Sequence, residues 1–359
     1  MKLLIPVLSI LMLFSCTDND STSPDDKTPS DPSSQPVNQS RVVETLATQL
    51  DVPWQINIVE DTVYYLSGRP GEIIKIQDAA KESQTVDLTK GVVSETESGL
   101  LGFHIIDGSQ EPLEAYLYHT YEDRGRLLNR VVKVKQEGST WKETDILMEG
   151  IPGGPIHNGG RLAVGPDENL YITTGDAGES GLAQDRSSLA GKILRLNLDG
   201  SIPDDNPFAG SPVYSYGHRN PQGIDWTEDG KMYSSEHGST GHDEINEIVS
   251  GGNYGWPVIQ GDEEQEGMIE PLFHSGEDTW APSGIAISGS KIYAAFLAGQ
   301  QIREFDLDEK KSQTFTAGYG RMRDVEIVNG SLYAITNNRD GRGNPTPEDD
   351  RLLKFQLKE

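Results

Sequence analysis

The sequence predicts an all-β protein that folds as a six-bladed β-propeller, with four-stranded antiparallel blades around a central channel. Glycine (39 of 359 residues) and proline (20) are abundant, and long helical periodicity is absent, which favours short strands joined by many turns. A short strand that contains a tyrosine recurs six times, and a β-sandwich would not repeat such a unit at roughly constant spacing. The six tyrosines are Tyr64, Tyr118, Tyr171, Tyr233, Tyr293 and Tyr333.

Each tyrosine strand lies between two further predicted strands. The strand that follows it is short and mainly apolar, as at residues 73–76 and 193–196. The strand that precedes it would be the innermost strand of a blade and would line the channel. We expect these inner strands at residues 54–59, 99–106, 161–165, 223–227, 284–288 and 324–328.

The outermost strand of a blade is visible in only some repeats, for example at residues 84–88 and 313–315. The sixth repeat has none, because the sequence ends at Glu359, soon after the third strand of that repeat. Residues 42–46 have strand character and stand before the first blade. We therefore expect this segment to complete the sixth blade and close the ring, which removes an exposed sheet edge.

The first 40 residues have a different character from the repeats. Lys2 and the apolar run to Phe14 have the pattern of a secretory signal, and the run is too short to span a bilayer. We interpret residues 1–15 as a signal peptide and Cys16 as the lipid attachment site of a bacterial lipoprotein; an ordinary signal peptide with an incidental cysteine is the alternative. Residues 16–40, rich in Asp, Ser and Pro, would be a flexible tether to a propeller domain at 41–359.

This interpretation places the protein outside the cytoplasm, anchored by lipid alone at the periplasmic or cell-surface side of a bacterial membrane. The formal net charge of −27 argues against nucleic acid and anionic membrane surfaces as partners. A single cysteine excludes an intramolecular disulfide and a cysteine-based metal site.

Polar residues stand at the entrance to the inner strands of several repeats. Equivalent positions in a propeller converge on the axis, so we expect these residues to share one pocket. Any one of them alone is better explained by a hydrogen bond to a neighbouring loop. Together, three arginines, a histidine and an acid are costly to bury without partners, which indicates a polyanionic ligand beside a general base. The residues are Glu97, His157, Arg219, Asn220, Thr279, Arg321 and Arg323.

The motifs around these residues occur in a specific order. They include G-L-L-G-F at Gly99, H-N-G-G-R-L-A-V-G-P-D at His157, Y-G-H-R-N-P-Q-G at Tyr216, G-G-N-Y-G-W-P at Gly251 and R-M-R-D-V at Arg321. At these motifs the sequence resembles the soluble aldose sugar dehydrogenases that use pyrroloquinoline quinone (PQQ), in the glucose/sorbosone dehydrogenase family. The resemblance covers nearly all of residues 42–359.

The resemblance implies oxidation of aldose sugars at the anomeric carbon to lactones, with PQQ and calcium as cofactors and an external electron acceptor. It implies that His157 is the general base and that Arg219 polarises the quinone carbonyl. Asp176 stands where the family orients its catalytic histidine, although a turn aspartate is an equally good explanation. Cofactor contacts are implied for Glu97, Asn220, Thr279, Arg321 and Arg323.

Calcium is implied at two places. The backbone carbonyls of Gly238 and Ser239 would bind the ion together with the quinone. A second, structural calcium could use Gln260, Asp262 and Glu264, but a solvated acidic loop is the better explanation of these three residues. One departure from the family is Ala298, which stands where some members direct a lysine at the quinone, and this puts the affinity for PQQ in question.

Two other functions remain compatible with the fold, because a propeller hosts many activities. A calcium-dependent lactone or ester hydrolase would need acidic metal ligands around the axis, whereas the predicted axis is basic. A non-catalytic propeller that binds carbohydrate or a protein partner would tolerate the loss of His157.

Overall fold

The structure is a computed structural model and describes residues 42–106 and 112–357. Within these ranges it consists of β-strands and one short 3-10 helix, η2 (Ser180–Ala183). The predicted signal peptide, Cys16 and the tether to residue 40 lie outside the described residues. Across the described ranges, no helix has the length and apolar character needed to cross a membrane.

Three sheets each contain four consecutive strands that pair in chain order with antiparallel neighbours. The first is β10 (Leu162–Val164), β11 (Leu170–Thr174), β12 (Lys192–Leu196) and β13 (Val213–Tyr216). The second is β14 (Pro221–Trp226), β15 (Met232–Glu236), β16 (Glu244–Ile248) and β17 (Phe273–His274). The third is β18 (Pro282–Ser288), β19 (Lys291–Phe296), β20 (Gln301–Asp306) and β21 (Lys311–Ala317).

A fourth sheet joins the two ends of the described chain. It has the order β1 (Val42–Ala47), β24 (Leu352–Gln356), β23 (Ser331–Thr336) and β22 (Met322–Val328). Strand β1 runs antiparallel to β24, with Thr45 opposite Leu353. The prediction that residues 42–46 complete the last repeat is therefore confirmed.

The remaining eight strands form one sheet made of two antiparallel halves. Strands β5 and β9 connect the halves through a parallel pairing in which Thr85 lies opposite Thr140. The sequence did not predict this pairing. It satisfies backbone groups that outer strands otherwise expose. The halves are β2 (Pro53–Val59), β3 (Val63–Gly68), β4 (Glu72–Gln77) and β5 (Ala80–Asp87), then β6 (Leu100–Ile105), β7 (Glu114–Asp123), β8 (Arg126–Glu137) and β9 (Thr140–Pro152).

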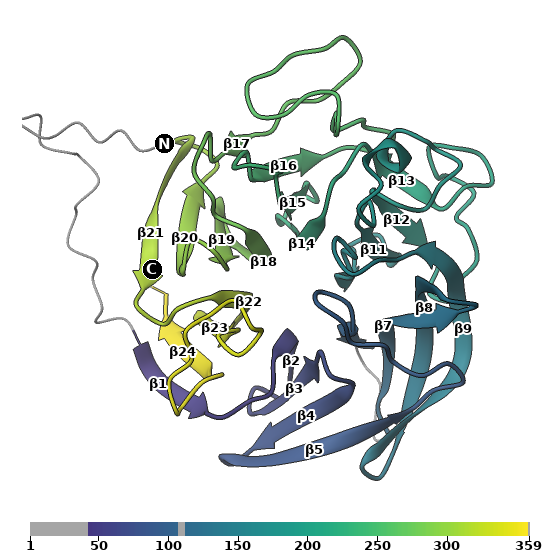
Figure 1. The fold of residues 1–359 in the computed structure, drawn as a ribbon. Coiled ribbons are helices and arrows are strands. Elements are labelled where there is room, and N and C mark those ends of the chain that lie inside the picture. The colour runs from purple at the N-terminus through teal and green to yellow at the C-terminus, as the bar shows by residue number, and fades with distance from the viewer. Residues whose placement is uncertain (1–41, 107–111, 358–359) are drawn as a thin grey trace, which may run out of the picture. The chain divides into compact units, whose positions relative to one another are not determined.

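The sheets of residues 42–357 are arranged around a common centre, as in a β-propeller (Figure 1). Strands β2, β14, β18 and β22 lie nearest that centre, and all six predicted inner strands match observed strands to within a few residues. Side chains of the inner strands link one repeat to the next. Asn57 Oδ1 accepts a hydrogen bond from Ile105 N (2.9 Å), and Asp225 Oδ2 accepts one from Ile287 N (2.7 Å).

Strand β1 should contribute measurably to stability, because it covers the edge of β24 and places Leu46 and Ala47 against the apolar cluster around Leu352. We expect removal of residues 1–40 to leave the melting temperature unchanged. Removal of residues 1–48 should lower it by roughly 5 °C or more, on a scale of about 2–4 °C per kcal/mol. Thermal unfolding followed by circular dichroism measures both, and identical curves for the two truncations would contradict the closure.

Candidate functional site

A cavity of about 180 Å³ lies where the loops that enter the inner strands meet. The structure brings three of the predicted residues, Glu97, Arg321 and Arg323, to its wall. Two neighbours of other predicted residues also line the cavity: Gln222, in the segment around Arg219, and Asn158, next to His157. Of the seven residues predicted to share one pocket, three thus line this cavity, whereas His157, Arg219, Asn220 and Thr279 do not.

Arg321 and Arg323 flank Met322 at the start of β22. Arg323 donates from one terminal nitrogen to Gln222 Oε1 (2.8 Å) and from the other to Asn337 Oδ1 (3.1 Å). Arg321 pairs with Asp340 Oδ2 (3.0 Å). Burial lowers the pKa of Arg323 to about 9. The Nε atoms of both arginines are buried and have no hydrogen-bond partner among the described residues, which leaves two donors for a ligand.

His157 forms a pair with Asp176. Its Nδ1 lies 2.7 Å from Asp176 Oδ1, and the other carboxylate oxygen accepts a hydrogen bond from Trp256 Nε1 (2.9 Å). The carboxylate also accepts the backbone N–H of Gly178 (2.8 Å), so Asp176 is both a turn residue and the partner of the histidine. Burial raises the pKa of Asp176, but the interaction with His157 and the hydrogen bonds from Gly178 and Trp256 together outweigh burial and hold that pKa below its ordinary value.

This pair determines which ring nitrogen of His157 is available. A carboxylate at Nδ1 favours the tautomer that carries its proton there, which leaves Nε2 as a proton acceptor. The side chain is 14 % exposed, so the ring is largely shielded but open to a small substrate. The geometry is that of a general base oriented by an acid.

The backbone at His157 is held in the left-handed region, with φ of 55°, which residues other than glycine rarely adopt. Its N–H donates to Glu97 Oε2 (3.1 Å). Its carbonyl oxygen lies against Gly175, where a Cβ atom would collide with it. The close approach of these two segments therefore requires glycine at position 175.

Arg219 and Asn220 lie beside this pair. Arg219 donates to the carbonyl oxygen of His237 (3.2 Å) and lies over the Trp256 ring, 5.4 Å from its centroid. Asn220 Oδ1 accepts the N–H of Gly159 (3.0 Å). Burial lowers the pKa of Arg219. Arg219 Nε and Asn220 Nδ2 are buried without a partner among the described residues, which adds two more free donors.

The predicted calcium-binding carbonyls lie close to Arg219. Gly238 lines a small cavity together with Arg219 and His237, and its N–H is held by Asp243 Oδ1 (2.8 Å). Ser239 is exposed and donates to Gln260 Oε1 (2.6 Å). The structure therefore places this turn at the edge of the site.

Other predicted residues do not come together. Asp262 is 93 % exposed and contacts His274 (2.9 Å), and Glu264 is exposed, so neither joins Gln260 in a cluster. Within the described ranges, no group of three or more His, Cys, Asp or Glu side chains is placed to hold a metal. Thr279 is also exposed and does not line the cavity, whereas Ala281 does.

Several lining residues were not predicted from the sequence. Arg69, His237 and Arg342 line the cavity, and the buried Asp340 contacts Arg342. Arg342 and Asp340 belong to the segment N-R-D-G-R-G-N-P-T-P-E-D-D, residues 338–350, between β23 and β24. The alternation of arginine and aspartate directly after the last tyrosine strand was the available signal.

Burial and neighbouring charges shift the pKa values of groups in the cavity wall. Burial raises the pKa of Glu97, but the positive charge of Arg342, 2.6 Å away, and the hydrogen bonds from Arg342 and the His157 N–H together outweigh burial and lower that pKa to about 2. Burial lowers the pKa of His237 to about 3, so its ring is neutral. The cavity is therefore lined by four arginines and one ionised carboxylate.

The family model described as Glucose / Sorbosone dehydrogenase matches residues 50–352. Quinoprotein glucose dehydrogenase B from Acinetobacter calcoaceticus is 33 % identical over 62 % of this chain, but the chain spans only 54 % of that relative. Aldose sugar dehydrogenase YliI from Escherichia coli (strain K12) is 29 % identical over 83 % of this chain and 91 % of its own length. The PQQ-bound structure of aldose sugar dehydrogenase from Streptomyces coelicolor superposes with a TM-score of 0.82 at 36 % identity, covering 89 % of this chain and 98 % of that one.

Gly175→Ala should disturb the site, because the added Cβ meets the carbonyl of His157. Overpacking of this kind typically costs about 1–3 kcal/mol, so we expect a melting temperature lower by about 2–12 °C. The matched control is Gly91→Ala, where nothing lies within 4 Å of the new Cβ. Differential scanning calorimetry that finds both variants as stable as the wild type would show that the two segments are not in close contact.

Proposed function

Because the chain belongs to the glucose/sorbosone dehydrogenase family, we propose that it oxidises aldose sugars at the anomeric carbon to lactones, using PQQ and calcium. The electrons pass to an external acceptor. The match of the family model supports the reaction class, and the PQQ-bound Streptomyces structure and the quinoprotein relative support the cofactor. The fold is a propeller of six blades, in which the eight-stranded sheet counts as two.

The observation that carries the proposal is the set of buried, unpartnered donors in the cavity wall and beside the His157–Asp176 pair. Such donors are costly unless a ligand accepts their hydrogen bonds. A flat quinone that carries several carboxylates offers acceptors of the right kind, and a neutral sugar alone would leave the arginine charges uncompensated. The donors are Arg219 Nε, Asn220 Nδ2, Arg321 Nε and Arg323 Nε.

Bound PQQ would supply the two-electron acceptor that takes hydride from the anomeric carbon of the sugar. His157 Nε2 takes the proton of the anomeric hydroxyl, and Asp176 stabilises the imidazolium that results. Arg219 would polarise the quinone carbonyl of bound PQQ, and Asn220 would hydrogen-bond nearby. Arg321 and Arg323 would hold its carboxylates, and Glu97 contributes to the cavity wall.

Calcium is proposed at the turn of Gly238 and Ser239, whose backbone carbonyls are hard oxygen ligands of the kind the ion prefers. Gly238 and Arg219 line the same small cavity, which supports this position, since the ion and Arg219 would then contact the same ligand. Thr279, Asp262 and Glu264 have no role in the proposal, because the structure leaves them exposed, whereas Gln260 contacts the turn through Ser239.

The direct test is to titrate the purified protein with PQQ and calcium and then to add an aldose sugar. We expect saturable binding and a change in quinone absorbance when sugar is added. Binding of PQQ without reduction by any aldose would favour a non-catalytic binding protein. Hydrolysis of a lactone with calcium alone would favour the hydrolase.

His157→Gln should remove the proton acceptor and keep the shape of the site. Loss of a general base typically costs 10²–10⁴-fold, so we expect PQQ reduction in single-turnover assays to fall by about that factor while PQQ affinity stays near the wild-type value. His218→Gln is the control: its Nδ1 contacts Glu236 (2.8 Å) and its Nε2 contacts Ser215 (2.8 Å), away from the cavity. Wild-type reduction rates in His157→Gln would refute the assigned base.

We also propose that the protein is exported and anchored through a lipid on Cys16, which lies outside the described residues. The support is the leader pattern of residues 1–15 and the position of the single cysteine directly after it. In fractionated cells, Cys16→Ala should move the protein from the membrane to the soluble fraction. Equal membrane partitioning of variant and wild type would argue against the anchor.

A further inference from the structure

We propose that Arg342 is a further carboxylate-binding residue of the cavity and provides the positive charge that Ala298 does not. The inference rests on the proposed function, because it concerns how the same cavity binds PQQ. Arg342 belongs to the 337–351 loop, which connects β23 to β24. Both Arg342 and Ala298 line the cavity.

The 337–351 loop is held firmly at the cavity. Asn337 Nδ2 donates to the carbonyl oxygen of Pro53 (3.2 Å), which ties the loop to the first repeat. Asn338 Oδ1 accepts the N–H of Arg321 (2.8 Å), which ties it to the start of β22. Asp350 accepts hydrogen bonds from the backbone of Asn338 and Arg339. Arg342 thus extends from an anchored loop.

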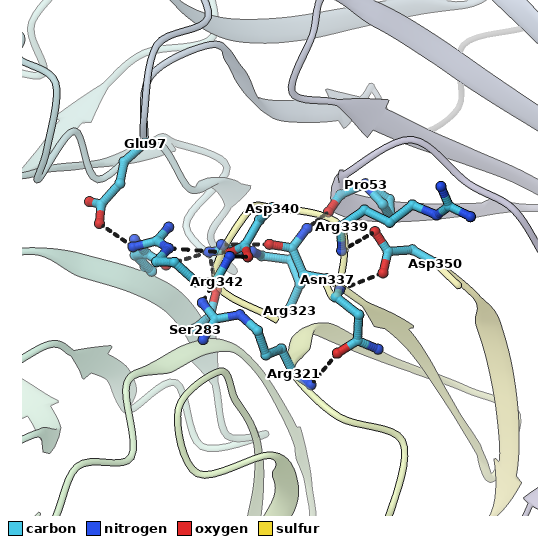
Figure 2. Close-up of polar contacts among 12 residues, drawn as sticks. Pro53, Glu97, Ser283, Arg321, Arg323, Asn337, Arg339, Asp340, Arg342 and Asp350 are labelled. Atoms are coloured by element: carbon cyan, nitrogen blue, oxygen red, sulfur yellow. Dashed lines mark hydrogen bonds and ion pairs between the residues drawn. The ribbon is translucent and has the colours of Figure 1, made fainter. Parts of the chain in front are cut away.

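The guanidinium of Arg342 is oriented on two sides and open on the third. Its NH1 pairs with Glu97 Oε1 (2.6 Å) and its Nε lies 3.5 Å from Asp340 Oδ2. Asp340 is fully buried and also pairs with Arg321. Figure 2 shows the resulting row of Arg321, Asp340, Arg342 and Glu97. A guanidinium has five N–H donors, and the Arg342 side chain is 43 % exposed, so donors remain for a ligand at the mouth of the cavity.

The charges around the cavity favour a ligand with more than one carboxylate. Arg69, Arg321, Arg323 and Arg342 line it, and among the described residues the ion pairs to these arginines come from Glu97 and Asp340. Ala298 on the same wall is apolar and offers no charge. A second or third carboxylate of the ligand is then best placed against Arg342, whose side chain is directed by ion pairs on both flanks.

The test is the affinity of the PQQ-free, full-length protein for PQQ at fixed calcium, measured by equilibrium dialysis or by quenching of tryptophan fluorescence, since Trp54 lines the cavity. A charge-assisted hydrogen bond corresponds to about tenfold or more in Kd. We therefore expect Arg342→Ala to weaken PQQ binding by about that factor, as Arg323→Ala should. Arg339→Ala is the matched control in the same loop, because the Arg339 side chain donates to the carbonyl oxygen of Asp349.

Removing Arg342 also leaves Glu97 without its ion-pair partner, so the same substitution is made in a Glu97→Gln background. A tenfold loss in both backgrounds supports a direct contact with the ligand. Equal affinity of Glu97→Gln and the double variant would mean that Arg342 only neutralises Glu97, and the proposal would be wrong. Ala298→Lys added to Arg342→Ala should recover at least several-fold in affinity.

Other results of these titrations would overturn either this inference or the proposed function. If Arg69→Ala weakens binding and Arg342→Ala does not, the additional carboxylate contact belongs to Arg69 and the inference is overturned. If Arg342→Ala unfolds below the assay temperature, Arg342→Gln is measured instead, because it keeps most of the side-chain packing. No PQQ binding by the wild type would overturn the proposed function itself, whereas equal binding by wild type and Arg342 variants would overturn only this inference.

Discussion

The pairing of β1 with β24 is the contact on which the functional site depends, because it brings the start and the end of the described chain to one place. Once the ring is closed, Asp324 Oδ2 on β22 accepts the N–H of Ile56 on β2 (2.8 Å), 268 positions away in sequence. The same closure lets the 337–351 loop bond to Pro53. An open ring would leave unpaired strand edges and would separate Trp54 and Arg69 from the arginines of β22.

The cavity of the closed ring is lined by four arginines, which pair with two carboxylates, Glu97 and Asp340. Asp340 pairs with Arg321, and Gln222 and Asn337 accept hydrogen bonds from Arg323. The guanidinium carbon of Arg161 lies 4.5 Å from the centroid of the Trp54 ring. The remaining buried N–H groups cost stability in the unliganded protein. Such a cost is a common feature of binding sites, where donors are held ready for a ligand. The left-handed backbone at His157 belongs to the same pattern.

Prediction from the sequence worked where the repeat itself carries the information. The inner strands and the closing strand follow from alternating apolar residues and turn residues at a regular spacing, and equivalent loops must meet at the axis. For this reason Glu97, Arg321 and Arg323 could be placed in one cavity in advance. Thr279 occupies an equivalent position in sequence, but its side chain is exposed and does not line the cavity.

The sequence by itself determined the all-β class, the repeated unit, the closing segment and the family motifs around His157, because each depends on local pattern or on motif order. Only the tertiary structure decided which charges face one another. The parallel pairing of β5 with β9 and the row from Arg321 to Glu97 join segments with no fixed sequence relation. Ion pairs between such segments depend on distances of a few ångströms, and those distances exist only after the ring has closed.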